Sequence, residues 1–81
     1  MRIRTLLFAS YRELLGTGEM TLSLPGKATV ADLVEELRSR GEPFSRLPDD
    51  PVVAVNRKYA SPQDVLREGD EVALIPPVAG G

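Results

Sequence analysis

The chain has 81 residues, which is enough for one small domain with a modest core, and its 42% hydrophobic content is too high for a disordered chain. A formal net charge of −2 and an aromatic content of 5% disfavour binding to nucleic acid or to an anionic membrane. No apolar run approaches the roughly 18 residues of a membrane span, and the N-terminus lacks a signal-peptide layout, so the sequence predicts a cytoplasmic protein.

Residues 1–9 are predicted to form the first strand, and a short helix is expected over residues 10–15. Alternation divides the strand between two faces, with Ile3, Thr5 and Leu7 on one and Arg4, Leu6 and Phe8 on the other. Because both faces become apolar toward its end, we expect a central strand that is covered at least partly on each side. Ser10 is the expected N-cap of the short helix, with Glu13 placed to complete a capping box.

A second strand is predicted over residues 19–24, because Met20, Leu22 and Leu24 alternate with polar residues. The main helix is expected to begin after Thr29, an N-cap residue, with Asp32 in its first turn and Gly41 placed for its C-cap. Its spacing at i, i+3, i+4 and i+7 predicts one buried apolar stripe made of Val30, Leu33, Val34 and Leu37.

The second half of the chain is predicted to form a connection and three strands. Residues 42–51 form a polar connection that Phe44 and Leu47 pin to the core. Residues 52–56 read as a buried strand, residues 58–60 as a short one after a turn at Asn56 and Arg57, and residues 71–75 as the last. An acidic turn precedes the last strand. Its charges can belong to an ordinary exposed turn or can contact a basic partner, and the two interpretations explain them equally well.

This order of elements predicts an α+β fold of the ubiquitin-like β-grasp type. We expect a mixed sheet of about five strands packed on one main helix, with the last strand parallel to the first in the middle of the sheet. The predicted domain covers residues 1–75, and a flexible Gly-Gly tail covers residues 76–81.

The tail reads PPVAGG and has an unusual design for a chain terminus. Pro76 and Pro77 have a fixed φ and no backbone N–H, so a strand cannot continue in register through them. Gly80 and Gly81 lack a Cβ, so such an end can enter a narrow tunnel in another protein. The alternative is an ordinary frayed terminus. The chain contains no Cys and no His, so we expect no metal site, and any sulfur chemistry must use something other than a cysteine.

Four stretches of the chain carry a resemblance to a known family. They are LLFASYRELLGTGE (6–19), TVADL (29–33), VAVN (53–56) and LREGDEVALIPPVAGG (66–81), and together they span most of the sequence. The chain resembles the small subunit of molybdopterin synthase, a ubiquitin-like sulfur carrier. Leu74 and Ile75 depart from the pattern, because aromatic residues often precede the prolines in this family.

The resemblance implies a sulfurtransferase role that this chain performs only within a complex. Gly81 would be adenylated by an E1-like adenylyltransferase that uses ATP, and a persulfide donor would convert it to a thiocarboxylate. Gly80 would give the slim approach into the synthase large subunit, in a heterotetramer where the sulfur reaches the pterin precursor. The implied partner-binding residues are Phe8, Leu74, Ile75, Pro76, Pro77 and Val78. No cofactor would be bound by this chain itself.

Several alternatives remain open from the sequence. Phe8, Leu74 and Ile75 can equally be core residues, and Arg12 and Glu13 can be a solvated helix surface rather than partner contacts. The same carrier chemistry serves thiamine, cysteine and tRNA thiolation, and the same terminus serves ubiquitin-like modification of lysines. A third reading is a non-enzymatic β-grasp interaction module in which the two terminal glycines are incidental.

Overall fold

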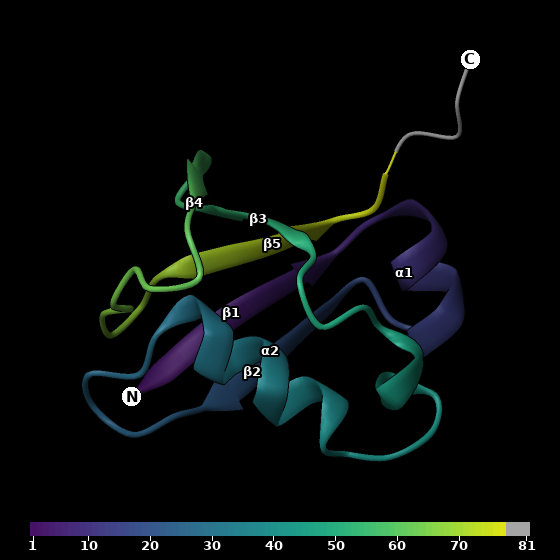
Figure 1. The fold of residues 1–81 in the computed structure, drawn as a ribbon, viewed down its shortest axis with the longest axis horizontal. Helices are drawn as coiled ribbons and strands as arrows, with labels where there is room; N and C mark the ends of the chain where they lie inside the picture. Colours follow the sequence, from purple (N-terminus) through teal and green to yellow (C-terminus); the bar gives the residue numbers. More distant parts are fainter. Residues whose placement is uncertain (78–81) are drawn as a thin grey trace.

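The computed structural model describes residues 1–77, which form one sheet with helices packed on one side of it (Figure 1). The elements in chain order are β1 (Arg2–Leu7), α1 (Ala9–Leu15), β2 (Glu19–Ser23), α2 (Val30–Arg38), the 3-10 turn η1 (Phe44–Arg46), β3 (Val52–Val55), β4 (Lys58–Ala60) and β5 (Glu71–Ile75). The predicted tail residues Val78, Gly80 and Gly81 lie outside the described residues.

The sheet has the strand order β2-β1-β5-β3-β4. The first and last strands pair in parallel at its centre, and the other neighbours pair antiparallel. Residues far apart in the sequence therefore meet in the middle of the domain, as the purple and yellow strands of Figure 1 show. The predicted α+β architecture with five strands and one main helix is confirmed.

Strand β1 lies between β2 and β5 as expected, but its two faces are covered unequally, since only Leu6 is partly buried on the second face. Ile3, Thr5 and Leu7 have at most 1% of their surface exposed and face the core. Phe8, just after the strand on the other side, is 47% exposed. The physical reason is the layering, because α2 packs on the core side and, within residues 1–77, the other side of the sheet carries no helix.

Helix α1 begins one residue earlier than predicted, and Ser10 is not its N-cap. The chain leaves β1 through Phe8 in an extended conformation, and Ala9 then takes a left-handed φ of 45°. This turn makes Phe8 the N-cap, and its carbonyl accepts from the N–H groups of Tyr11 and Arg12. No side chain caps the helix. Tyr11 is buried, and this burial raises the pKa of its phenol.

Helix α2 forms largely as its sequence predicts. Thr29 and Asp32 form a reciprocal capping box, with Thr29 Oγ1 accepting from the Asp32 N–H at 3.2 Å and Asp32 Oδ2 accepting from the Thr29 N–H at 2.9 Å. All four residues of the apolar stripe are buried. The C-cap is Ser39 rather than Gly41, because the Ser39 N–H and hydroxyl both bond to carbonyls of the last helical turn.

The connection after α2 is pinned to the core as predicted. Leu47 is 1% exposed, and Phe44 packs against the buried cluster. Strand β3 is only partly buried, because Val53 faces the core whereas Val52 is 52% exposed. The predicted turn between β3 and β4 is present.

Candidate functional site

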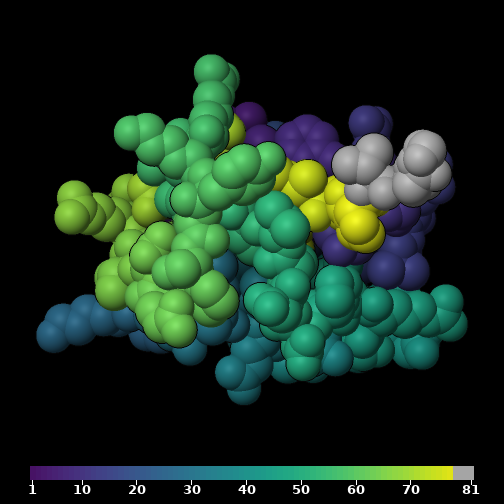
Figure 2. Space-filling model, turned by 45° about the horizontal axis from the view of Figure 1, so that its top comes forward, coloured from purple at the N-terminus to yellow at the C-terminus, as the bar shows by residue number. Residues whose placement is uncertain are grey.

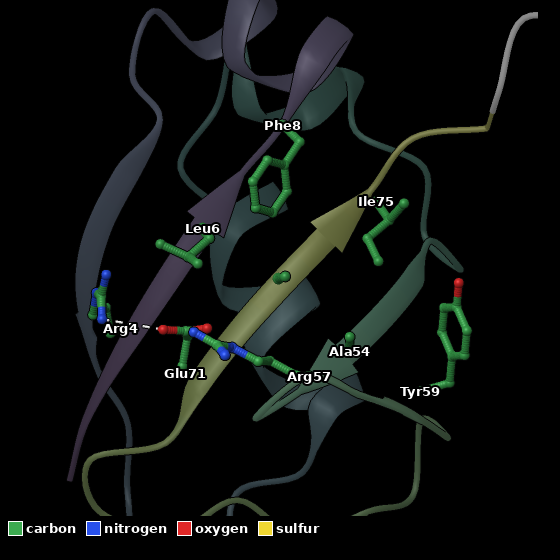
Figure 3. A pocket seen from close by; sticks show the side chains of 9 residues that line it. Arg4, Leu6, Phe8, Ala54, Arg57, Tyr59, Glu71 and Ile75 are labelled. Atoms are coloured by element: carbon green, nitrogen blue, oxygen red, sulfur yellow. Dashed lines mark hydrogen bonds and ion pairs between the residues drawn. The ribbon is translucent and has the colours of Figure 1, made fainter.

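The face of the sheet opposite α2 carries a hollow of about 520 Å³, shown in Figure 3. We call this side of the sheet the open face. Side chains from the four adjacent strands and from the turn between β3 and β4 line it, namely Arg4, Leu6, Phe8, Ala54, Arg57, Tyr59, Glu71, Ala73 and Ile75. The hollow is open to solvent and lies beside the strand that leads into the tail.

Strand pairing explains why the sheet is hollowed there. Ala54 and Ala73 stand opposite each other in β3 and β5, so the middle of the face has only methyl side chains. Larger side chains flank them, because the register places Leu6 opposite Ala73 and Tyr59 opposite Ala54. Small residues in the centre and large residues around them make a depression on an otherwise flat sheet.

The end of the hollow away from the tail is charged. Arg4 Nη1 lies 3.1 Å from Glu71 Oε2, and Arg4 Nε lies 3.2 Å from Glu19 Oε2. Asn56 holds the adjacent turn in place, since its side-chain oxygen accepts from the Glu71 N–H and its amide nitrogen donates to Asp70. Arg4 and the side chain of Asn56 are therefore both bound at the beginning of β5.

The end of the hollow near the tail is apolar. Phe8 and Ile75 both lie on the open face there (Figure 3), so two of the predicted partner-facing residues are brought together. Pro76 is half-buried and Pro77 is exposed, and both directly follow β5. The tail therefore starts from the central strand pair, next to the apolar end of the hollow, and in Figure 2 the yellow atoms of the last described residues lie at the surface.

Leu74 does not belong to this face. It has 0% of its surface exposed and lies in the core cluster, so its assignment to a docking surface is wrong. Side chains alternate along β5, and Val72 and Leu74 point toward α2 whereas Ala73 and Ile75 point to the open face.

Sequence reasoning missed Tyr59 and Leu6 as members of the candidate site. Tyr59 is 80% exposed, which is a large apolar surface left in solvent. The sequence held one signal for Tyr59, namely the predicted two-residue turn before it. This turn sets the register of β4 against β3, and the register decides that Tyr59 faces the same way as Ala54.

The open face offers apolar contact and charge rather than reactive groups. In residues 1–77 no cluster of His, Cys, Asp or Glu side chains is placed to hold a metal ion. In the same residues neither helix is long and apolar enough to cross a bilayer. The arrangement is that of a binding surface placed at the base of a terminal segment.

The fold and this surface define the chain as a ubiquitin-like β-grasp protein. A mixed sheet crossed by one main helix, with the last strand central, is shared with the solved structures it resembles. The chain belongs to the ThiS family, whose sequence model matches residues 5–81.

Similar proteins agree with the resemblance found in the motifs. The molybdopterin synthase sulfur carrier subunit of Chlamydomonas reinhardtii is 39% identical, and the match covers 100% of both chains. A solved structure of a putative molybdopterin converting factor, subunit 1, from Pyrococcus furiosus is 36% identical, with a TM-score of 0.84 over 96% of this chain and 99% of that one. Small archaeal modifier protein 1 of Haloferax volcanii is 31% identical, with a TM-score of 0.75 over 95% of this chain and 98% of that one.

Proposed function

We propose that this chain is the sulfur carrier subunit of a molybdopterin synthase, acting in molybdenum cofactor biosynthesis in the cytoplasm. The observation that carries the proposal is full-length similarity to a protein of that name, joined to a fold whose central strand leads directly into PPVAGG. The domain of residues 1–75 presents the segment 76–81, which carries the sulfur.

The chemistry proposed for Gly81 follows from the properties of a terminal carboxylate. A C-terminal carboxyl has a pKa of about 3.3–3.7, so at neutral pH it is charged and a poor electrophile. Adenylation by an E1-like partner with ATP gives an acyl-adenylate, from which AMP is a good leaving group. The outer sulfur of a persulfide donor then attacks the acyl carbon and displaces AMP, which gives an acyl disulfide. A second thiol of the donor reduces the S–S bond, so that the donor becomes a disulfide and the thiocarboxylate is released. The proposal fits a chain without cysteine, because the sulfur would be borne by the backbone terminus.

The open face is proposed as the docking surface for the synthase large subunit. Phe8 and Ile75 supply apolar contact next to the tail, and Tyr59 extends this surface across the hollow. Pro76, Pro77 and Val78 would line the partner's channel, and Gly80 would allow Gly81 to reach its far end. Docking of the open face on the large subunit would then also place the tail for sulfur delivery, because the tail begins at the edge of that face.

Intact mass spectrometry tests the sulfur chemistry. The chain is incubated with its E1-like adenylyltransferase, ATP and a persulfide donor, and we expect a mass gain equal to the exchange of one oxygen for sulfur, located on Gly81 by fragmentation. A chain that lacks Gly80 and Gly81 is the control. No gain with an adenylyltransferase shown to be active on another substrate contradicts the proposal.

Matched substitutions test the docking surface. Phe8→Asp introduces a charge into the apolar end of the face, whereas Val65→Asp does so at another exposed apolar residue, 58% exposed and outside the hollow. We expect the first to abolish binding to the large subunit and the second to leave it unchanged. Equal binding by both variants would remove the open face from the proposal.

A second function is favoured by the similarity to small archaeal modifier protein 1. A modifier would form isopeptide bonds between Gly81 and lysines of other proteins. Enrichment of lysine adducts from cells that express a tagged chain distinguishes the two, since a dedicated carrier gives a thiocarboxylate and no adducts. Carriers for thiamine, cysteine or tRNA thiolation would give the same mass gain but would not bind a synthase large subunit.

A further inference from the structure

Arg57 occupies a backbone position that a long side chain rarely takes. The turn between β3 and β4 has two residues with positive φ, 50° at Asn56 and 71° at Arg57. Two-residue hairpin turns of this kind favour Asn at the first position and Gly at the second. Asn56 fits the pattern and forms the hydrogen bonds described above, whereas Arg57 stands where glycine is preferred. An unfavourable backbone of this kind points to a use for the side chain.

The Arg57 side chain lies over the open face. It lines the hollow, and in Figure 3 it extends across β5 toward Arg4 and Glu71. The Glu71 carboxylate is bound to Arg4 at 3.1 Å, and Arg4 also binds Glu19. Within residues 1–77 Arg57 forms no ion pair.

The charged end of the hollow therefore carries one guanidinium group that is not bound by a carboxylate of residues 1–77. Two guanidinium groups and one carboxylate line it, and Glu19 binds Arg4 from just outside it, so these four charges sum to zero and Arg57 is the guanidinium among them that has no ion pair within residues 1–77. The neighbouring surface is apolar, with Leu6, Ala73 and the ring of Tyr59. A purely apolar partner that covered this surface would take the Arg57 charge out of water without compensation, which is strongly unfavourable.

We propose that Arg57 is a specificity-determining residue that pairs with an Asp or Glu side chain of the synthase large subunit. The acidic residue of the large subunit would be surrounded by apolar side chains of the same subunit. These side chains would fill the hollow and displace its water, and the ion pair would form in the same step. The pairing selects a partner that places a carboxylate over this turn, and it rejects apolar surfaces that lack one. The inference rests on the proposed function insofar as the large subunit docks on the open face.

Charge substitutions on the full-length chain test the pairing. We expect Arg57→Glu to raise the Kd for the large subunit about a hundredfold, Arg57→Gly about tenfold, and Arg57→Lys less than either. Lys58→Glu is the matched control, because it makes the same charge change next door on the side of β4 opposite Tyr59 and outside the hollow. It should change the Kd less than about threefold. Isothermal titration calorimetry at low and high salt gives each Kd.

The Arg57→Gly variant separates a loss of binding from a loss of folding. Glycine is the residue this backbone favours, so Arg57→Gly should keep or raise the thermal unfolding midpoint while it weakens binding. Charge-swap rescue completes the experiment. Each Asp or Glu on the docking surface of the large subunit is changed to Lys in turn, and one such change should restore binding to Arg57→Glu and weaken binding to the unsubstituted chain.

Two results would overturn the inference. One is a Kd for Arg57→Glu that matches the Kd for Lys58→Glu, and the other is the absence of any rescuing acidic position. Neither result affects the sulfur chemistry, which the mass gain on Gly81 tests separately. If Phe8→Asp abolishes binding and Arg57→Glu does not, the open face stands as the docking surface and only the ion pair is excluded.

Discussion

Arg4 and Glu71 stand directly opposite each other in the parallel pairing of β1 and β5, and their side chains meet on the open face with 3.1 Å between Nη1 and Oε2. Arg4 also reaches Glu19, so one guanidinium ties three adjacent strands together. The Arg4 side chain is 53% exposed and that of Glu71 26%, so water and salt screen much of the attraction.

We therefore expect Arg4→Gln to lower the free energy of unfolding by only about 0.5–1 kcal/mol, and by less at high salt. Urea denaturation at low and high ionic strength measures this. A loss that is large and independent of salt would show that the aliphatic part of Arg4, rather than its charge, holds the sheet.

Thr5 is the one polar side chain in the buried set, with 0% exposure, and its Oγ1 has no hydrogen-bond partner among the described residues. A buried hydroxyl without a partner costs about 1–3 kcal/mol. Thr5→Val keeps the shape and removes the hydroxyl, so we expect unchanged or increased stability. Thermal unfolding of Thr5→Val and of Thr21→Val, at an exposed position of β2, checks this, and destabilisation at position 5 alone would reveal a hidden partner for the hydroxyl.

Leu74 and Ile75 are adjacent in β5 but face opposite sides of the sheet. Substitutions at these two positions should therefore affect stability and binding separately. Leu74→Ala removes a fully buried side chain and should lower the free energy of unfolding by about 2–5 kcal/mol. Ile75→Ala acts on the open face and should mainly raise the Kd for the large subunit. Urea denaturation and calorimetry on both variants measure the two effects, and the reverse pattern would invert the assignment of the two faces of β5.

The capping box of α2 is expected to contribute measurably to stability. Thr29→Ala removes the acceptor for the Asp32 N–H and should cost about 1 kcal/mol. Thr29→Ser keeps the acceptor and should cost much less. Chemical denaturation of the two variants gives the difference, and equal losses would show that the threonine methyl group, not the hydroxyl, matters here.

Because Tyr11 is buried, we expect the free energy of unfolding to fall at high pH. Burial raises the pKa of its phenol, so the folded state favours the neutral form. The contribution of this group is complete below the unfolded pKa of about 10 and is lost as the pH rises through the higher folded value. Tyr11→Phe should flatten the decline in unfolding free energy between about pH 9 and about pH 11, with Tyr59→Phe at an exposed ring as the control. A decline that is the same in all three proteins would place its origin elsewhere.

The sequence predicts the elements of this fold well because the information is local. Thr29 with Asp32 marks the start of α2, and the stripe from Val30 to Leu37 marks its buried side. Alternation in β1 and β2 correctly separates each strand into two faces.

What the sequence leaves open is which face the helix covers. Leu6, Phe8 and Ile75 are as apolar as Leu74, and only the packing of α2 makes one a core residue and the others part of the open face. The hollow depends on the pairing of β3 with β5, so the turn before Tyr59 indicates which way its ring faces but not that a hollow lies beside it. The start of α1 depends on the left-handed turn at Ala9, which alanine seldom takes. The roles of Pro76, Pro77, Val78, Gly80 and Gly81 stay predictions.

The central place of β5 has a consequence for biosynthesis. A ribosome makes β1 first and β5 last of the sheet strands, yet these two are neighbours in the middle of the sheet. Until residue 75 has been added, β1 and β3 each keep an unpaired edge and the core lacks Val72 and Leu74. A prematurely ended chain is therefore left with exposed strand edges, which makes it a target for proteolysis and chaperones. A chain that carries PPVAGG therefore already contains every strand that its sheet needs.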